Sequence, residues 1–91
     1  MEKAQVRQAA SSLLKQLNTL SEKGKSDWAS WVLAQQVNKL LDAARPLLDA
    51  DVAALLPVNF RQGGTGLAGA KIIDLAAGVQ QIVDVLYEGQ G

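Results

Sequence analysis

Apolar residues recur along this chain at alternating intervals of four and three, and this spacing constrains the fold more than any other feature. In the first segment the recurring residues are Val6, Ala10, Leu13, Leu17 and Leu20. Near the C-terminus they are Ile72, Ala76, Val79, Val83 and Leu86. Intervals of four and three place side chains on one face of an α-helix. The chain is therefore expected to form amphipathic helices that pack along these faces.

Helix-starting and helix-ending residues divide the chain into four predicted helices. Gly24 supplies the left-handed conformation at which helices commonly end, and Ser26 suits the N-cap of the next helix. Pro46 lacks an amide hydrogen and should break that helix near Arg45. The approximate predicted bounds are 3–23, 26–45 and 66–88 for three long helices and 47–56 for a short one.

These helices predict an all-α protein, a small antiparallel helical bundle that forms a single domain over residues 1–91. The helix over 26–45 has the broadest apolar face, so we expect it at the centre of the bundle. A chain of 91 residues buries only about 60–65% of the surface that its unfolded form exposes. We therefore expect a homo-oligomer, in which a second copy covers part of the apolar surface.

The helical pattern is interrupted by a cluster of four glycines: Gly63, Gly64, Gly66 and Gly69. The segment from Gly64 to Gly69 matches the spacing of the dinucleotide-binding fingerprint, but that fingerprint needs a strand before it, and here a predicted helix and Pro57 precede it. The main interpretation is a turn at Gly63 and Gly64, followed by small residues at which another backbone passes closely. A flexible joint is a further interpretation. Inside the last helix, Gly78 likewise predicts a neighbour pressed against its face.

An anion- or nucleotide-binding module is the alternative function for the glycine-rich loop, residues 61–71. Backbone amides at a helix N-terminus attract anions, and Arg61, Thr65 and Lys71 are the candidate ligands. The four glycines, together with Trp28, Phe60 and Arg61, are also the candidates for contacts with another protein. Tryptophan is enriched in binding hot spots, and of the two tryptophans Trp31 is the one expected in the core.

The composition argues against catalysis. The chain has no histidine and no cysteine, so the usual general base, the thiol nucleophile and the soft metal ligands are missing. The acidic cluster of Asp42, Asp49 and Asp51 matches no calcium loop. We therefore expect a protein that is not an enzyme and that has neither a metal site nor a cofactor.

Charge is balanced over the whole chain but not between its halves. The chain contains nine Lys or Arg residues and nine Asp or Glu residues. Residues 1–46 contain seven basic and four acidic residues, whereas residues 47–91 contain two and five. The halves can pair within the chain or head to tail between chains. A weaker alternative, a nucleic-acid accessory protein, rests on the basic residues of the first helix and its turn, which are Arg7, Lys15, Lys23 and Lys25.

The N-terminus lacks the apolar stretch of a secretory signal, and no apolar run approaches the roughly 18 residues of a membrane span. The expectation is a cytoplasmic protein without membrane contact. It is expected to self-associate and to act by protein–protein binding, as an adaptor, a regulator or an inhibitor. The partner's identity is not encoded in any motif.

Overall fold

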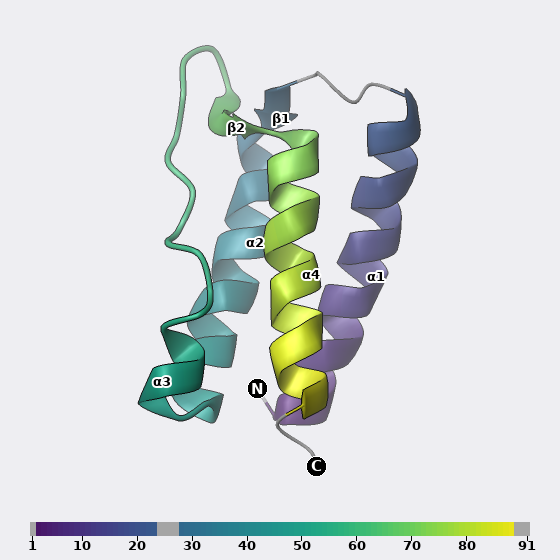
Figure 1. Ribbon diagram of the computed structural model, residues 1–91. Coiled ribbons are helices and arrows are strands. Elements are labelled where there is room, and N and C mark those ends of the chain that lie inside the picture. The colour runs from purple at the N-terminus through teal and green to yellow at the C-terminus, as the bar shows by residue number, and fades with distance from the viewer. Residues whose placement is uncertain (1, 24–27, 89–91) are drawn as a thin grey trace.

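The computed structural model describes residues 2–23 and 28–88, which form helices and two short strands (Figure 1). In chain order the elements are α1 (Lys3–Lys23), β1 (Trp28–Ser30), α2 (Trp31–Ala44), a 3₁₀ turn (Arg45–Leu47), α3 (Ala50–Ala53), β2 (Leu67–Lys71) and α4 (Ile72–Glu88). The bounds of α1 are those predicted from the sequence. The described part of the molecule is elongated, with principal extents of 39 × 22 × 19 Å.

The three long helices enclose one apolar core, to which both strands also contribute. α1 packs mainly along α4, and α2 packs on α4 and to a smaller extent on α1. The central position that we expected for the second helix therefore belongs to α4. The buried side chains of α4 cover a broad arc: Ile72, Leu75, Ala76, Val79, Ile82, Val85 and Leu86. Among the described residues, no polar or charged residue is fully buried.

The prediction of an all-α protein is wrong, because β1 and β2 form a two-stranded antiparallel sheet. Trp28 lies opposite Lys71 and Ser30 lies opposite Leu67, with an irregularity between the two pairs. The sheet takes residues that were expected to be helical, so the second and last helices begin later than predicted. The side chains that the sheet turns toward the core belong to Ala29, Ala68 and Ala70, which are small enough for it to sit closely on the helix ends.

The start of α2 at Trp31 has a local cause. The Ser30 side chain occupies the N-cap position, and its Oγ accepts a hydrogen bond from the Leu33 amide at 3.3 Å. The expected cap Ser26 and the expected stop Gly24 lie outside the described residues. Ser30 thus caps α2 while it also ends β1, which is why no helix extends through Trp28.

The antiparallel arrangement predicted for the bundle holds only for α1. Each strand leads directly into a helix and the strands pair with each other, so α2 and α4 begin at the same end and run in the same direction (Figure 1). A long connection between α3 and β2 makes this possible, because it returns the chain along the length of the bundle. We call the end at which the two strands lie the sheet end.

The short helix predicted over residues 47–56 is much shorter in the structure. α2 ends at Ala44 and Pro46 lies in the 3₁₀ turn, which confirms the predicted break. α3 covers only Ala50–Ala53; Asp49 precedes it, but its side chain makes no capping hydrogen bond. Starting a helix is unfavourable, and a single turn without a side-chain cap gains few hydrogen bonds to offset that cost, so α3 does not extend further. In the described part of the chain, no helix combines the length and the apolarity needed to cross a membrane.

Candidate binding surface at the sheet end

The glycine cluster forms a tight turn that brings the chain into β2. The Leu67 amide donates to the Gly64 carbonyl at 3.1 Å, and both central residues have positive φ, 55° at Thr65 and 74° at Gly66. Positive φ at both central positions is the signature of a type I′ turn. The cluster therefore does make a turn, but the turn is centred on Thr65 and Gly66 rather than on Gly63 and Gly64.

Residues 61–63 pair with β2 on the far side of this turn. The Gly63 amide donates to the Leu67 carbonyl and the Gly69 amide donates to the Arg61 carbonyl, both at 2.8 Å. A Cβ at Gly63 would lie 3.1 Å from the Ala68 backbone, a tight contact, so glycine suits the close approach of the two segments here. The closely passing backbone therefore lies at Gly63, which was expected in the turn, and not at Gly66, where nothing lies within 4 Å of an added Cβ; at Gly69 the Arg61 carbonyl lies at an ordinary contact distance of 3.5 Å.

The two strands present an outer face that is only partly covered by side chains. Residues alternate along β2, with Leu67 and Gly69 exposed between buried alanines. In β1, Trp28 is 54% exposed, while the next residue is buried. Trp28, Leu67 and Gly69 therefore share the outer face of the sheet. Trp31, which was expected in the core, is half-buried and packs against it.

A hollow of about 360 Å³ lies on this outer face. It is lined by Trp28, Gly63, Gly64, Thr65, Leu67, Ala68 and Gly69, and we call these residues the sheet-end surface. The hollow exists because glycines stand where larger side chains would fill the space beside Trp28 and Leu67. The structure thus brings together Trp28 and three of the four glycines that the sequence indicated as binding residues.

Positive charge borders the sheet-end surface. The Lys71 ammonium lies 5.7 Å from the centroid of the Trp28 ring, a distance suited to a cation–π contact. Arg61 is exposed, and neither cation forms an ion pair with another residue that the structure describes. Asp74 is exposed as well, and its carboxylate accepts a hydrogen bond from the Lys71 amide at 3.0 Å at the start of α4.

Four amides of the glycine-rich loop are engaged within the chain. Those of Gly63, Leu67, Gly69 and Lys71 donate to the acceptors described above. The Thr65 hydroxyl donates to the Gly64 carbonyl at 2.8 Å. α4 also begins at Ile72 rather than within the glycine cluster, so a helix N-terminus cradled by glycines is not formed here. An anion at this loop would meet fewer donors than the sequence indicates.

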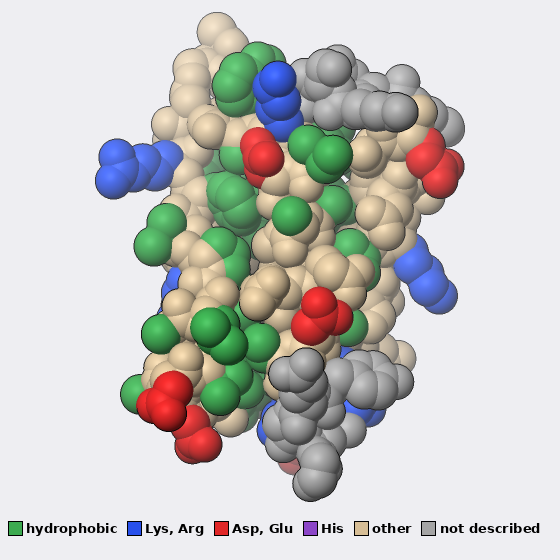
Figure 2. Space-filling model, in the orientation of Figure 1, with side chains coloured by type: hydrophobic (Ala, Val, Ile, Leu, Met, Phe, Trp, Pro, Cys, Tyr) green, Lys and Arg blue, Asp and Glu red, His purple; other side chains and the backbone are tan. Residues whose placement is uncertain are grey.

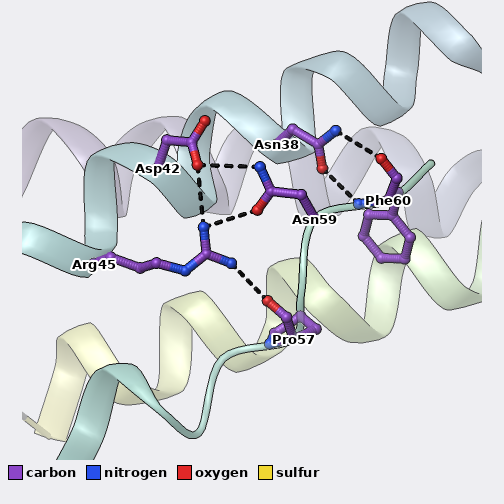
Figure 3. A network of polar contacts seen from close by, with 6 residues as sticks. All are labelled: Asn38, Asp42, Arg45, Pro57, Asn59 and Phe60. Atoms are coloured by element: carbon purple, nitrogen blue, oxygen red, sulfur yellow. Dashed lines mark hydrogen bonds and ion pairs between the residues drawn. The ribbon is translucent and has the colours of Figure 1, made fainter. Parts of the chain in front are cut away.

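Phe60 lies apart from the sheet-end surface, on the connection between α3 and β2. Its ring lies 3.4 Å from a Cβ built at Gly78, and Pro57 lies 3.5 Å from the same point. The neighbour predicted for Gly78 is therefore confirmed. The backbone of Phe60 is held by Asn38, whose side chain donates to the Phe60 carbonyl at 3.1 Å and accepts from the Phe60 amide at 2.8 Å (Figure 3).

A second group of polar contacts holds the same connection one turn further along α2 (Figure 3). Arg45 donates to the Pro57 carbonyl and to the Asn59 side chain, both at 2.8 Å, and pairs with Asp42 at 3.1 Å. Asn59 also donates to Asp42 at 3.1 Å. Sequence reasoning missed this network, because its members are ordinary polar residues with no characteristic spacing.

The remaining sequence-derived candidates give no further site. Lys15 is exposed and Arg7 half-buried on α1, while Lys25 and the side chain of Lys23 lie outside the described residues. In the described part of the chain, no group of His, Cys, Asp or Glu side chains is arranged to hold a metal ion. No protein-family model, curated protein or solved structure matches the chain.

Proposed function

We propose that this chain self-associates and acts by binding another protein, as an adaptor, a regulator or an inhibitor, through the sheet-end surface. The observation that carries the proposal is the exposure of Trp28 beside a hollow on an otherwise small, apolar sheet. A tryptophan can bury about 150–250 Å² of surface, and tryptophans in such positions dominate many protein interfaces. We also propose the cytoplasm as its compartment, which immunolocalisation of the tagged chain would test.

The chemistry of the surface indicates the kind of segment that would bind. The hollow is floored by backbone and flanked by Trp28 and Leu67, so it suits an apolar side chain of the partner. Arg61 and Lys71 border it, which favours a partner segment that also carries a carboxylate. An acidic peptide segment with one protruding apolar residue meets both requirements.

The test compares capture of proteins from the native cell by the wild-type chain and by two variants. Trp28→Ala removes the aromatic contact. Gly69→Ala adds a methyl group to the floor of the hollow, and its Cβ would lie an unstrained 3.5 Å from the Arg61 carbonyl, so the fold should persist. We expect both variants to lose the partner, with at least a tenfold lower affinity once the partner is purified and titrated.

Val32→Ala is the matched control, because Val32 is 63% exposed but does not line the hollow. Retention of the partner by both Trp28→Ala and Gly69→Ala would overturn the proposal. Amide shifts confined to residues 61–71 on titration with inorganic phosphate, without any protein partner, would favour the anion-binding alternative instead.

A further inference from the structure

An apolar groove lies at the end of the molecule opposite the sheet. It is lined by five apolar side chains, which are Leu47, Leu48, Val52, Leu55 and Val85, and we call it the α3 groove. Its volume is about 340 Å³, near the lower limit of about 300 Å³ for ligand pockets in proteins. Leu55 is 61% exposed, so the groove holds apolar surface that the described residues leave uncovered.

Acidic side chains flank the α3 groove. Asp49 lines it, and Asp51 is exposed in the first turn of α3. Neither carboxylate forms an ion pair with another described residue. Lys3 also lines the groove, so the acidic rim is interrupted on the side of α1. Figure 2 shows apolar side chains gathered over α3, with acidic side chains at the corner of the molecule.

The two ends of the molecule are complementary in shape and charge. The sheet end presents an exposed aromatic residue, Trp28, bordered by Lys71 and Arg61. The α3 end presents a groove lined by five apolar side chains, Asp49 and Lys3, and Asp51 is exposed on α3. The sheet and α3 lie at opposite ends of the long axis (Figure 1). The sheet end therefore carries the exposed aromatic side chain and two cations, and the α3 end carries the groove and two carboxylates. Because these surfaces lie at opposite ends of one copy, they can meet only between two copies.

We propose that the α3 groove binds the sheet-end surface of a second copy of this chain, with Trp28 in the groove and Lys71 and Arg61 facing Asp49 and Asp51. The inference rests on the self-association in the proposed function and specifies how the copies meet. The sheet end carries two cations, Lys71 and Arg61, beside one carboxylate, Asp74, and the α3 end carries two carboxylates beside Lys3, so contact between like ends joins surfaces of the same net charge. Charge therefore favours contact between unlike ends.

Contact between unlike ends has a consequence for the assembly. The interface is heterologous, so a dimer keeps one free groove on one copy and one free sheet end on the other. Assembly then continues copy by copy until it closes into a ring or reaches a length set by concentration. A two-fold symmetric dimer, in contrast, would stop at two copies.

Analytical ultracentrifugation of the full chain and of two variants tests the inference. Trp28→Ala leaves the groove intact, while the double variant Asp49→Lys, Asp51→Lys leaves the sheet end intact. We expect the wild-type mass to rise beyond that of a dimer with concentration, and to fall in salt near 1 M, where the Debye length is about 3 Å. Each variant alone is expected to be monomeric, and an equal mixture of the two is expected to form a dimer and stop there.

Asp84→Lys is the control for charge reversal, because Asp84 is exposed on α4 and does not line the groove. Circular dichroism and the melting temperature show that each variant is folded. A wild-type chain that stays monomeric near 1 mM, the limit of a weak interface, would overturn the inference, as would a mixture that remains monomeric. A monomeric wild-type chain would also overturn the self-association in the proposed function, whereas a wild-type chain that associates while the mixture stays monomeric would overturn this inference alone. Partner capture that depends on Trp28 would survive either result.

Discussion

Asn38 on α2 and Phe60, 22 residues further along the chain, exchange two hydrogen bonds, one through each polar atom of the Asn38 amide. The amide side chain pairs with the Phe60 backbone much as a neighbouring strand would. Asn38 holds the connection at Phe60, while Arg45 and Asp42 hold it at Pro57 and Asn59. The Phe60 ring is thereby placed against Gly78 of α4.

Replacing Asn38 by Ala is expected to lower the free energy of unfolding by about 2 kcal/mol, because it leaves two partly buried backbone groups without their partner. Urea denaturation followed by circular dichroism measures this loss. Hydrogen exchange of the Phe60 amide should also accelerate. Gln36→Ala, at an exposed position of the same helix, should change neither quantity. Equal stability of both variants would show that the connection is held by other contacts.

Thr65→Asn is expected to raise the free energy of unfolding by about 1 kcal/mol. Thr65 is β-branched and has φ of 55°, a conformation that such residues adopt only with strain. Asn tolerates this conformation, and Asn followed by Gly is the preferred sequence of a type I′ turn. Gly66→Ala should have the opposite effect, because φ at Gly66 is 74°. Urea denaturation of both variants measures whether the free energy of unfolding rises or falls. A lower free energy of unfolding in Thr65→Asn would contradict this description of the turn.

Gly78→Ala is expected to stabilise the protein by about 1 kcal/mol. Alanine is favoured over glycine within a helix by about that amount, and the added Cβ would lie 3.4 Å from the Phe60 ring, which is a contact rather than a clash. Gly78→Leu is expected to destabilise by about 1–3 kcal/mol, since the longer side chain would displace Phe60 or Pro57. Thermal melts of the wild type and the two variants are expected to give the highest melting temperature for Gly78→Ala and the lowest for Gly78→Leu. A less stable Gly78→Ala variant would mean that Phe60 lies closer to α4.

Ser30→Ala is expected to lower the free energy of unfolding by about 1 kcal/mol, the usual effect of losing an N-cap side chain. Ser12→Ala makes the same chemical change at an exposed position within α1 and should be neutral or slightly stabilising. If the two variants lose equal stability, Ser30 does not act as a cap.

The helices were predictable because apolar spacing reports a buried face directly. The bounds of α1 followed from it together with Gly24, and the break after α2 followed from the backbone chemistry of Pro46. The sheet was not predictable in this way. β2 consists of Leu67, Ala68, Gly69, Ala70 and Lys71, which are poor strand formers and whose buried members are alanines. The Gly-Thr-Gly sequence of the turn was the one available signal of a hairpin.

The candidate site was predictable in its residue types but not in its geometry. Trp28 and the glycines stood out individually, yet they meet because β1 pairs with β2 across a long stretch of chain. Phe60 stood out equally and lies elsewhere, since Asn38 holds its backbone against α2. The α3 groove depends on where the connection leaves α3, which no local pattern encodes.

The packing of α1 along α4 bears on how the chain folds during its synthesis. α1 is made before α4, but most of its apolar face is covered by α4. Val6, Leu13 and Leu17 therefore stay largely exposed until α4 has been synthesised. Contacts between distant parts of a chain also slow folding, because a long loop must close before they form. The nascent chain thus presents an unprotected apolar face of α1 until α4 is available, a period in which chaperone binding and aggregation compete.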